Sequence, residues 1–194
     1  MVMHFLLNID IKCDSSTDID LLIQDAVGII KNHAMFNFRV VGEPRLLAVL
    51  KVDDENVVNT IFSSLIKLGS YTVMCTLLFS FADSKPMPYI GRSVMSPPNY
   101  TRRYYHWTDI TFDFNVNTPP SESAFHERVK LWNLEVEGQY CGILQLQTFK
   151  ELGKFRVHMF TCSTKPEGTE NLKLTLPENM SGQINKQIKM LTMI

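Results

Sequence analysis

The sequence lacks the signatures of several large functional classes. Its four cysteines are far apart, with no Cys-x-x-Cys pair and no histidine at zinc-ligand spacing. Neither a glycine-rich phosphate loop nor a nucleophile elbow occurs in its 194 residues. We therefore expect no metal and no nucleotide cofactor. Isolated cysteines of this kind are typical of free thiols in a reducing compartment.

A surplus of charge is absent as well. With 19 basic and 20 acidic side chains, the formal net charge is -1, which gives no electrostatic footprint for nucleic acid. The longest apolar run, residues 71–81, is too short to cross a membrane. The opening "MVMHFLLNIDIK" has no basic stretch before its apolar residues, so we interpret it as a first strand and not as a signal peptide. These features predict a cytoplasmic protein with no nucleic-acid or membrane partner.

The first half of the sequence does contain a regular alternation of strand and helix patterns. Residues 4–11 alternate in polarity, and residues 20–35 place apolar side chains at helical spacing. Two short strands are predicted on either side of the turn "GEPR". A second helix pattern then ends at Gly69, and the strand 71–81 follows. The order β-α-β-β-α-β is that of a ferredoxin-like unit.

The second half begins as the first one does. "DITFDFNVNTPPSESAFHERV" parallels "HFLLNIDIKCDSSTDIDLLIQ" at an offset of 105 residues. Two strands around the turn "KELG" follow, and the C-terminal residues predict a strand followed by a helix. Between the halves, residues 82–104 hold four of the nine prolines. We therefore expect a ferredoxin-like half (1–81), a proline-rich linker or covering loop (82–104), and a second, degenerate ferredoxin-like half (105–194).

A sheet of this kind carries helices on one face only, so its other face must be covered. A second such sheet, from the second half or from another chain, would close the pair. The predicted fold class is therefore α+β, a ferredoxin-like α/β barrel built from two related halves in one chain. The strand 71–81 is expected to pack one fully apolar face under helices: Tyr71, Val73, Cys75, Leu77, Phe79 and Phe81. Its other face has the mixed polarity typical of a ligand pocket.

Two stretches of the first half resemble a known family. "MHFLLNIDIK" resembles the opening strand of muconolactone isomerases, and "GEPRLLAVLKVDDENVVNTIFSSLIKLGSYTVMCTLL" is similar to their second βαβ segment. The resemblance covers about residues 3–80. It implies the barrel fold, oligomer formation, and cofactor-free isomerase or related lyase chemistry on a small organic acid.

Three candidates for acid/base catalysis lie on the polar strand faces. Proton transfer between carbons needs a base whose pKa is raised toward neutrality, beside a group that stabilises an enolate-like intermediate. Asp10 and Asp113 occupy equivalent places on their strands, where burial would raise their pKa values. In the alternative interpretation both lie solvated at strand ends. His4 lies on the same kind of face.

The stretch "TRRYYHWTD", residues 101–109, is the densest in groups suited to a site. A loop here could fold over the barrel mouth, with His106 as an acid or base and Tyr105 as a hydrogen-bond donor. Alternatively, Tyr105 and Trp107 simply begin a strand and pack. Further along, Arg156 beside His158 suits a carboxylate clamp, or else belongs to an exposed hairpin edge.

We expect a substrate pocket on the mixed face of the sheet. Its predicted substrate-binding residues are Asn8, Thr72, Thr76, Tyr105, Trp107, Asn115, Arg156 and His158. The predicted function is that of a cofactor-free isomerase, cyclase or lyase, which acts by acid/base chemistry on a small, largely apolar organic substrate. The alternative is a non-catalytic protein of the same fold that binds small ligands or serves in assembly. An ionisable residue fixed inside the pocket would favour the enzyme.

Overall fold

The fold is described from a computed structural model. The structure describes residues 2–14, 16, 18–81, 104–115, 119–139, 143–163, 165–167, 170–171, 173–176 and 181–194. The predicted linker 82–104 lies outside these residues except for Tyr104, and Cys141 lies outside them too. Two compact units divide the chain: Met1–Phe79 together with Leu191–Ile194, and Ser80–Met190.

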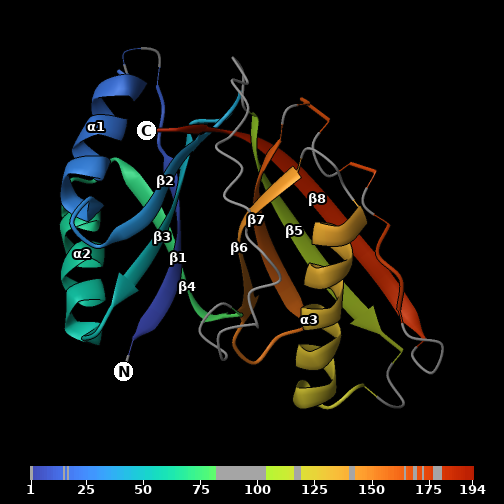
Figure 1. The fold of residues 1–194 in the computed structure, drawn as a ribbon. Helices are drawn as coiled ribbons and strands as arrows, with labels where there is room; N and C mark the ends of the chain where they lie inside the picture. Colours follow the sequence, from blue (N-terminus) through green and yellow to red (C-terminus); the bar gives the residue numbers. More distant parts are fainter. Residues whose placement is uncertain are drawn as a thin grey trace. The chain divides into compact units, whose positions relative to one another are not determined.

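The first unit is an antiparallel sheet with two helices on one face (Figure 1). Its elements are β1 (Met3–Ile11), α1 (Ile19–Ile30), β2 (Ala34–Val40), β3 (Arg45–Val52), α2 (Glu55–Lys67) and β4 (Tyr71–Ser80). β1 pairs with β3 and β4, and β2 pairs with β3. The resulting order, β4-β1-β3-β2, is that of the predicted ferredoxin-like unit.

Both helices of this unit begin at an aspartate cap. The side chain of Asp18 accepts a hydrogen bond from the backbone N–H of Leu21 at 3.1 Å, and Asp54 accepts one from Asn56 at 2.9 Å. The chain leaves α2 through Gly69, whose φ of 73° suits glycine. The apolar faces of both helices pack on the sheet in one core, which includes Leu7, Ile9, Ile30, Leu46, Leu50 and Leu65.

The prediction that one face of β4 packs under helices along its whole length was wrong. Tyr71 and Val73 pack in the core under the helices, but Leu77 and Phe79 are 37% and 39% exposed, and Cys75 is exposed as well. Along this strand, the core under α1 and α2 ends at Val73. The apolar face predicted to run from residue 71 to residue 81 is therefore covered by helices only at its beginning.

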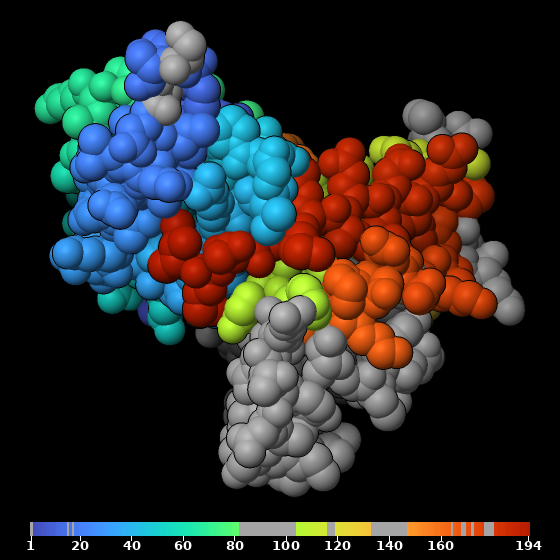
Figure 2. Space-filling view, turned by 90° about the horizontal axis from the view of Figure 1, so that it is seen from above, coloured from blue at the N-terminus to red at the C-terminus, as the bar shows by residue number. Residues whose placement is uncertain are grey.

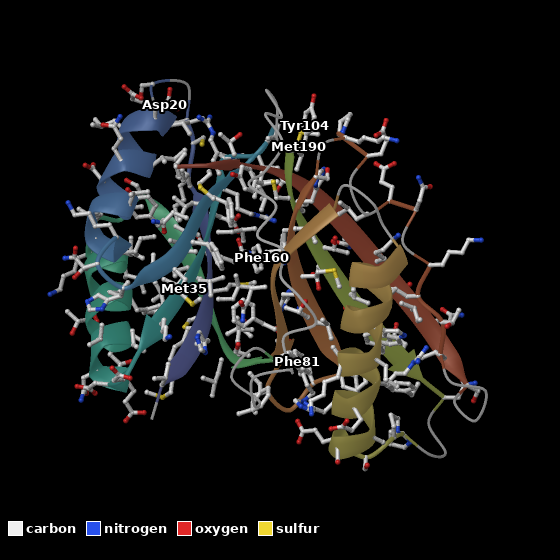
Figure 3. All side chains as sticks on the ribbon, in the orientation of Figure 1. Asp20, Met35, Phe81, Tyr104, Phe160 and Met190 are labelled. Carbon is white, nitrogen blue, oxygen red and sulfur yellow. The ribbon has the colours of Figure 1, made fainter. Side chains whose placement is uncertain are left out.

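The second unit is a sheet covered on one face by a single helix (Figure 1). Its elements are β5 (Tyr104–Phe114), α3 (Glu122–Gln139), β6 (Ile143–Glu151), β7 (Arg156–Ser163) and β8 (Gly182–Met193). β7 pairs with both β5 and β6. Aromatic rings dominate the core under α3: Phe81, Phe112, Phe125 and Trp132 pack there with Ile110, Val129 and Val157. Phe81 lies toward this core, whereas Phe160 lies on β7 away from the helix (Figure 3).

β5 begins five residues before its predicted start at residue 109. Tyr104 pairs with Ser163, and Trp107 pairs with Phe160. His106 and Trp107 are 2% and 5% exposed. Residues 104–108 are therefore not part of a loop over a barrel mouth, because their backbone groups are used in the ladder to β7. The alternative interpretation, in which Tyr105 and Trp107 begin the strand and pack, is confirmed.

The C-terminal segment is a strand, β8, and not the predicted helix. Ile184 and Ile188 are four residues apart, a spacing that suits a helix turn and two strand periods equally well. Exposure alternates with every residue from position 182 to position 188, which is the strand period. The end of β8 pairs with β2, where Phe38 lies opposite Met193. Figure 2 shows the C-terminal residues in red against the light blue of β2.

The hydrogen-bonded order of the strands is β1-β3-β2-β8-β5-β7-β6-β4, a closed series. The second half has the order β8-β5-β7-β6, which repeats β4-β1-β3-β2 of the first half. This confirms the predicted fold class, an α+β ferredoxin-like α/β barrel built from two related halves. None of the helices in the described ranges has the length and apolarity needed to cross a bilayer.

The close approach of β8 to β5 gives a stability prediction. A Cβ atom at Gly182 would lie 2.5 Å from the backbone oxygen of Asp113 and 3.0 Å from the Cα of Phe114. Because both are backbone atoms, we expect Gly182→Ala to lower the free energy of unfolding by about 1–3 kcal/mol. Gly28→Ala is the control, since no atom lies within 4 Å of that position in α1. It should raise the free energy of unfolding by up to about 1 kcal/mol.

Urea unfolding followed by circular dichroism measures both changes. Equal stability of the two variants would mean that β8 moves away from β5 without cost.

Candidate functional site

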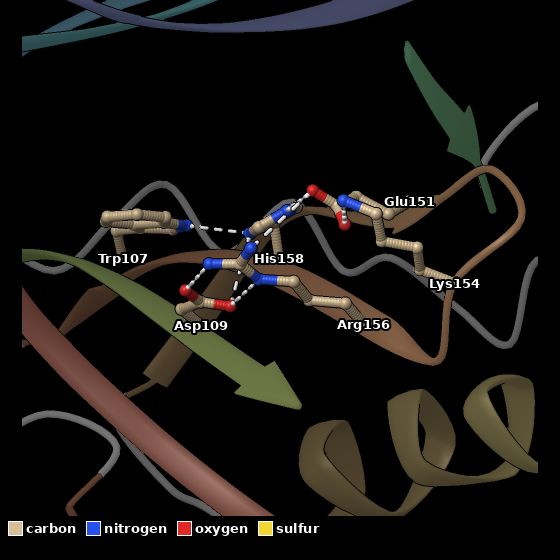
Figure 4. A network of polar contacts seen from close by, with 6 residues as sticks. All are labelled: Trp107, Asp109, Glu151, Lys154, Arg156 and His158. Carbon is tan, nitrogen blue, oxygen red and sulfur yellow. Dashed lines mark hydrogen bonds and ion pairs between the residues drawn. The ribbon is translucent and has the colours of Figure 1, made fainter. Parts of the chain in front are cut away.

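A network of polar side chains lies on the face of the second unit's sheet opposite α3 (Figure 4). Ile110, Phe112 and Val157 point into the core under α3. Because side chains alternate along a strand, Asp109 on β5 and His158 on β7 point the other way, and they lie directly opposite each other in the ladder. The other members of the network are Trp107, Glu151, Lys154 and Arg156.

Arg156 forms a two-point ion pair with Asp109. Its Nε and Nη2 donate to Oδ1 and Oδ2 of Asp109 at 2.8 Å and 2.5 Å. This bidentate contact raises the pKa of the Arg156 guanidinium, against the effect of burial. Nη1 of Arg156 lies 3.7 Å from Oε1 of Glu151. One guanidinium thus contacts two carboxylates, and its side chain is still 37% exposed.

His158, only 1% exposed, occupies the centre of the network. The indole Nε1 of Trp107 donates to His158 Nδ1 at 3.3 Å. Because an indole N–H can only donate, Nδ1 is the acceptor, and a neutral imidazole here carries its hydrogen on Nε2. Nε2 is buried, lies 3.8 Å from Glu151 Oε1, and has no hydrogen-bond partner within the described ranges. Trp107 therefore orients Nε2 as a buried donor near Glu151, at a distance too long for a hydrogen bond.

Glu151 is the most strongly perturbed carboxylate of the network. Its side chain is 3% exposed, and its Oε2 lies 3.2 Å from Nζ of Lys154. The interaction with His158 lowers the pKa of Glu151 to about 2, with Lys154 and Arg156 contributing, while burial opposes the shift. At neutral pH this carboxylate is an anion that holds cations in place, and it is too weak a base to remove a proton from carbon.

The low pKa of Glu151 predicts a loss of stability in acid. Its carboxyl titrates near the ordinary 4.5 in the unfolded chain and near 2 in the folded protein. The stabilisation is therefore complete above about pH 4.5, and it is lost as the pH falls toward 2. From pH 5 to pH 2, the wild type should lose on the order of 3 kcal/mol more of its unfolding free energy than Glu151→Gln.

Urea unfolding of both proteins across this pH range measures the difference. Parallel pH dependences would mean that Glu151 is not stabilised as an anion.

The arrangement can stabilise negative charge on an oxygen atom. A buried N–H that is already oriented, with a guanidinium beside it, is the kind of donor set that stabilises oxyanions. His158 Nε2 supplies the N–H, and the positive charges of Arg156 and Lys154 offset the negative charges of Asp109 and Glu151 around it. Within the described ranges, no group of three or more His, Cys, Asp or Glu side chains could hold a metal ion.

Three of the predicted site residues, Trp107, Arg156 and His158, come together in this network. The first unit holds five others: His4, Asn8, Asp10, Thr72 and Thr76. They share one face of β1 and β4, where Asp10 lies opposite Thr72. His4 is 3% exposed, and Asn8 Oδ1 is buried without a hydrogen bond to any described residue. Thr72 is exposed, however, and Thr76 is half-buried, so this end of the face is open within the unit.

The two aspartates are not buried as a general base requires. The Asp10 side chain is 42% exposed and accepts a hydrogen bond from Nε of Arg45 at 2.5 Å. Asp113 is exposed and accepts one from Asn185 at 2.6 Å. Each is the second-last residue of its strand, which is the position that the alternative interpretation described. The burial that the catalytic prediction requires is therefore not found.

The remaining predicted residues lie apart from His158. His106 points to the α3 side of β5, because it is adjacent to Trp107, and its Nε2 lies 2.7 Å from the carbonyl oxygen of Pro166. Asn115 is exposed and bonds Ser181 through both its backbone and its side chain. Tyr105 is half-buried on β5.

Glu151 and Asp109 were not among the site residues predicted from the sequence. A signal for Glu151 exists in the turn "KELG". The hairpin register pairs Lys150 with Val157, which sets Glu151 opposite Arg156 at the end of the ladder. A hairpin with a glycine at positive φ, here Gly153 at 74°, fixes such a register.

Neither a protein-family model nor a curated protein matches this sequence. Solved structures of similar fold do match over almost the whole chain. A candidate monooxygenase from Lactobacillus acidophilus has a TM-score of 0.56 at 7% identity, covering 99% of this chain and 93% of that one. An anthrone oxidase-like protein has a TM-score of 0.53 at 11% identity, covering 98% and 91%. A variant of chlorite dismutase from Candidatus Nitrospira defluvii has 0.60 at 9% identity, covering 98% and 91%.

These comparisons assign the class of fold. The chain has the ferredoxin-like α/β barrel that the candidate monooxygenase, the anthrone oxidase-like protein and chlorite dismutase share. At 7–11% identity, the likeness establishes the fold alone. The barrel implied by the resemblance to muconolactone isomerases is confirmed. The names of these structures are those of oxidoreductases and not of isomerases.

Proposed function

We propose that this chain is a small-molecule enzyme that stabilises an oxyanion of its substrate at His158. The observation that carries the proposal is the buried N–H at His158 Nε2, which makes no hydrogen bond to any of the residues that the structure describes. A buried donor without a partner costs about 1–3 kcal/mol, so a fold retains one where a ligand or water pairs with it. Trp107 fixes the ring through Nδ1, and this leaves Nε2 as the donor.

The chemistry that suits such a donor starts from a carbonyl compound with an acidic C–H bond. Transfer of this proton to solvent water gives an enolate, whose oxygen accepts a hydrogen bond from His158 Nε2 on the face of β7 that also carries Arg156. One donor of this kind contributes about 10²–10³ in rate. Trp107 and Asp109 are positioning residues, because they orient His158 and Arg156 and do not contact the reacting atoms.

Two reactions share this enolate. Reprotonation at another carbon makes an isomerase, as the resemblance over residues 3–80 implies. Transfer of electrons from the enolate to dioxygen makes an oxidase or oxygenase. We favour oxidation by dioxygen, because the structures that match nearly the whole chain include a candidate monooxygenase and an anthrone oxidase-like protein. The non-catalytic ligand-binding or assembly protein is the remaining alternative.

The test uses three probes with the full chain. Anthrone is incubated in air while oxygen uptake is recorded, chlorite consumption is followed separately, and muconolactone is followed by absorbance without oxygen. We expect oxygen uptake with anthrone. If muconolactone were isomerised and anthrone were not oxidised, the protein would be an isomerase and not an oxidase. Calorimetric binding of anthrone without any turnover would favour the non-catalytic protein. Neither binding nor turnover of the two carbonyl probes would contradict the proposal.

A further inference from the structure

A small cavity lies where α3 begins, and it shares one residue, Lys154, with the His158 network. Its volume is about 160 Å³, and its lining comprises Glu122, Lys150, Gly153, Lys154 and Phe155. Lys150 and Glu151 are adjacent on β6, so their side chains point to opposite faces. Lys150 points to the α3 side, where its Nζ lies 5.9 Å from the centroid of the Phe125 ring.

The floor of the cavity is a buried ammonium group. The Lys150 side chain is 4% exposed, and its Nζ donates to Oε1 of Glu122. An ammonium group has three N–H donors, yet Glu122 is the one hydrogen-bond acceptor that Lys150 reaches within the described ranges. Buried lysines are rare unless they are paired with an anion. Lys150 therefore needs an anion as its partner, and its ammonium group has more N–H donors than Glu122 accepts from.

The anion now on Lys150 comes from an exposed side chain. Glu122 lies in the first turn of α3, and its side chain is 61% exposed. The hydrogen bond from Lys150 lowers the pKa of Glu122, and a hydrogen bond from the backbone of Gly153 lowers it further. Lys154, 65% exposed and paired with Glu151 at 3.2 Å, places a second positive charge at the rim. The carboxylate of Glu122 thus occupies a set of cationic and backbone donors that would suit a free anion equally well.

We propose that this cavity binds a small anion, a carboxylate or phosphate group, that takes the place of the Glu122 carboxylate on Lys150. Glu122 is tethered but largely solvated, and ion pairs with an exposed partner are weak, so a free anion can compete with it. The start of α3 beside the cavity adds the positive end of a helix dipole. The proposal does not depend on the function proposed for His158.

Removal of the internal carboxylate provides the first test. The full chain is titrated with inorganic phosphate, and separately with acetate, in a calorimeter. We expect Glu122→Gln to bind the preferred anion at least about fivefold more tightly than the wild type, because the competing carboxylate is gone. Glu127→Gln is the matched control. It removes an acid from the same helix, where Glu127 pairs with Lys130, and its affinity should equal that of the wild type.

Removal of the cation provides the second test. In the Glu122→Gln background, Lys150→Met should abolish binding, whereas Lys150→Arg should keep it. If Lys150→Met does not fold, Lys154→Met in the same background should still weaken binding measurably. Tighter binding of phosphate than of acetate assigns a phosphate ligand, and the reverse order assigns a carboxylate. An affinity that is unchanged in Glu122→Gln, equal gains in Glu127→Gln, or binding that survives the loss of the lysines would each overturn the proposal.

Discussion

Replacing His158 with phenylalanine is expected to lower turnover at least about a hundredfold, because a planar aromatic ring is retained while the N–H that stabilises the oxyanion is lost. The effect should appear in kcat more than in KM, since the negative charge develops only in the transition state. Steady-state kinetics with the probe that the wild type converts measures both constants. Loss of the acceptor for Trp107 will also cost stability, so thermal unfolding is recorded in parallel.

A second substitution separates hydrogen-bond donation from a merely structural role. In His158→Gln, the side-chain amide can place an N–H near the former Nε2, so part of the activity should return. His33→Gln is the matched control, since it replaces a half-buried histidine that lies outside the network. It should behave as the wild type. Full activity in His158→Phe would contradict the role of this residue, and equal losses in the phenylalanine and glutamine variants would argue for packing alone.

The largest expected loss of stability follows from Phe125→Ala. Phe125 is 1% exposed, and its ring centroid lies 5.1 Å from that of Phe112, 6.2 Å from that of Phe114 and 5.1 Å from that of Phe155. All three contacts are edge-to-face, and they attach α3 to the sheet. Removing the ring should lower the free energy of unfolding by about 3–5 kcal/mol, as expected for a large aromatic side chain deleted from a core.

Leu131→Ala is the matched control for this loss. Leu131 lies on the same helix and is 50% exposed, so its replacement should change the free energy of unfolding by less than about 0.5 kcal/mol. Urea unfolding followed by circular dichroism measures both variants. If Phe125→Ala were as stable as Leu131→Ala, the aromatic core would not be what holds α3 on the sheet.

The order of elements in the first half was predictable because its periods are unambiguous. Asp18, Asp54 and Gly69 mark helix boundaries by well-understood local chemistry. β8 shows where this approach fails. Its apolar residues Ile184 and Ile188 fit both a helix and a strand, and only the ladders that β8 joins decide between them. Tertiary pairing, which one sequence does not display, determined this element.

The candidate site was predictable only in part, for a similar reason. His158 and Arg156 were recognised because they are two residues apart on one strand and therefore share one of its faces. Asp109 and Glu151 were not, because their importance comes from the strands that bring them to His158. Asp10 and Asp113 were chosen for a polar face whose burial depends on position along the strand. Both lie at strand ends, where solvent reaches them.

A crystal structure of the protein with bound anthrone would show whether His158 holds the substrate oxygen. We expect the carbonyl oxygen to lie within hydrogen-bond distance of His158 Nε2, about 2.7–3.1 Å, with the guanidinium of Arg156 beside it. Anthrone bound elsewhere, on the face of β1 and β4 that carries Asp10 or at His106, would contradict the assignment of the site to His158.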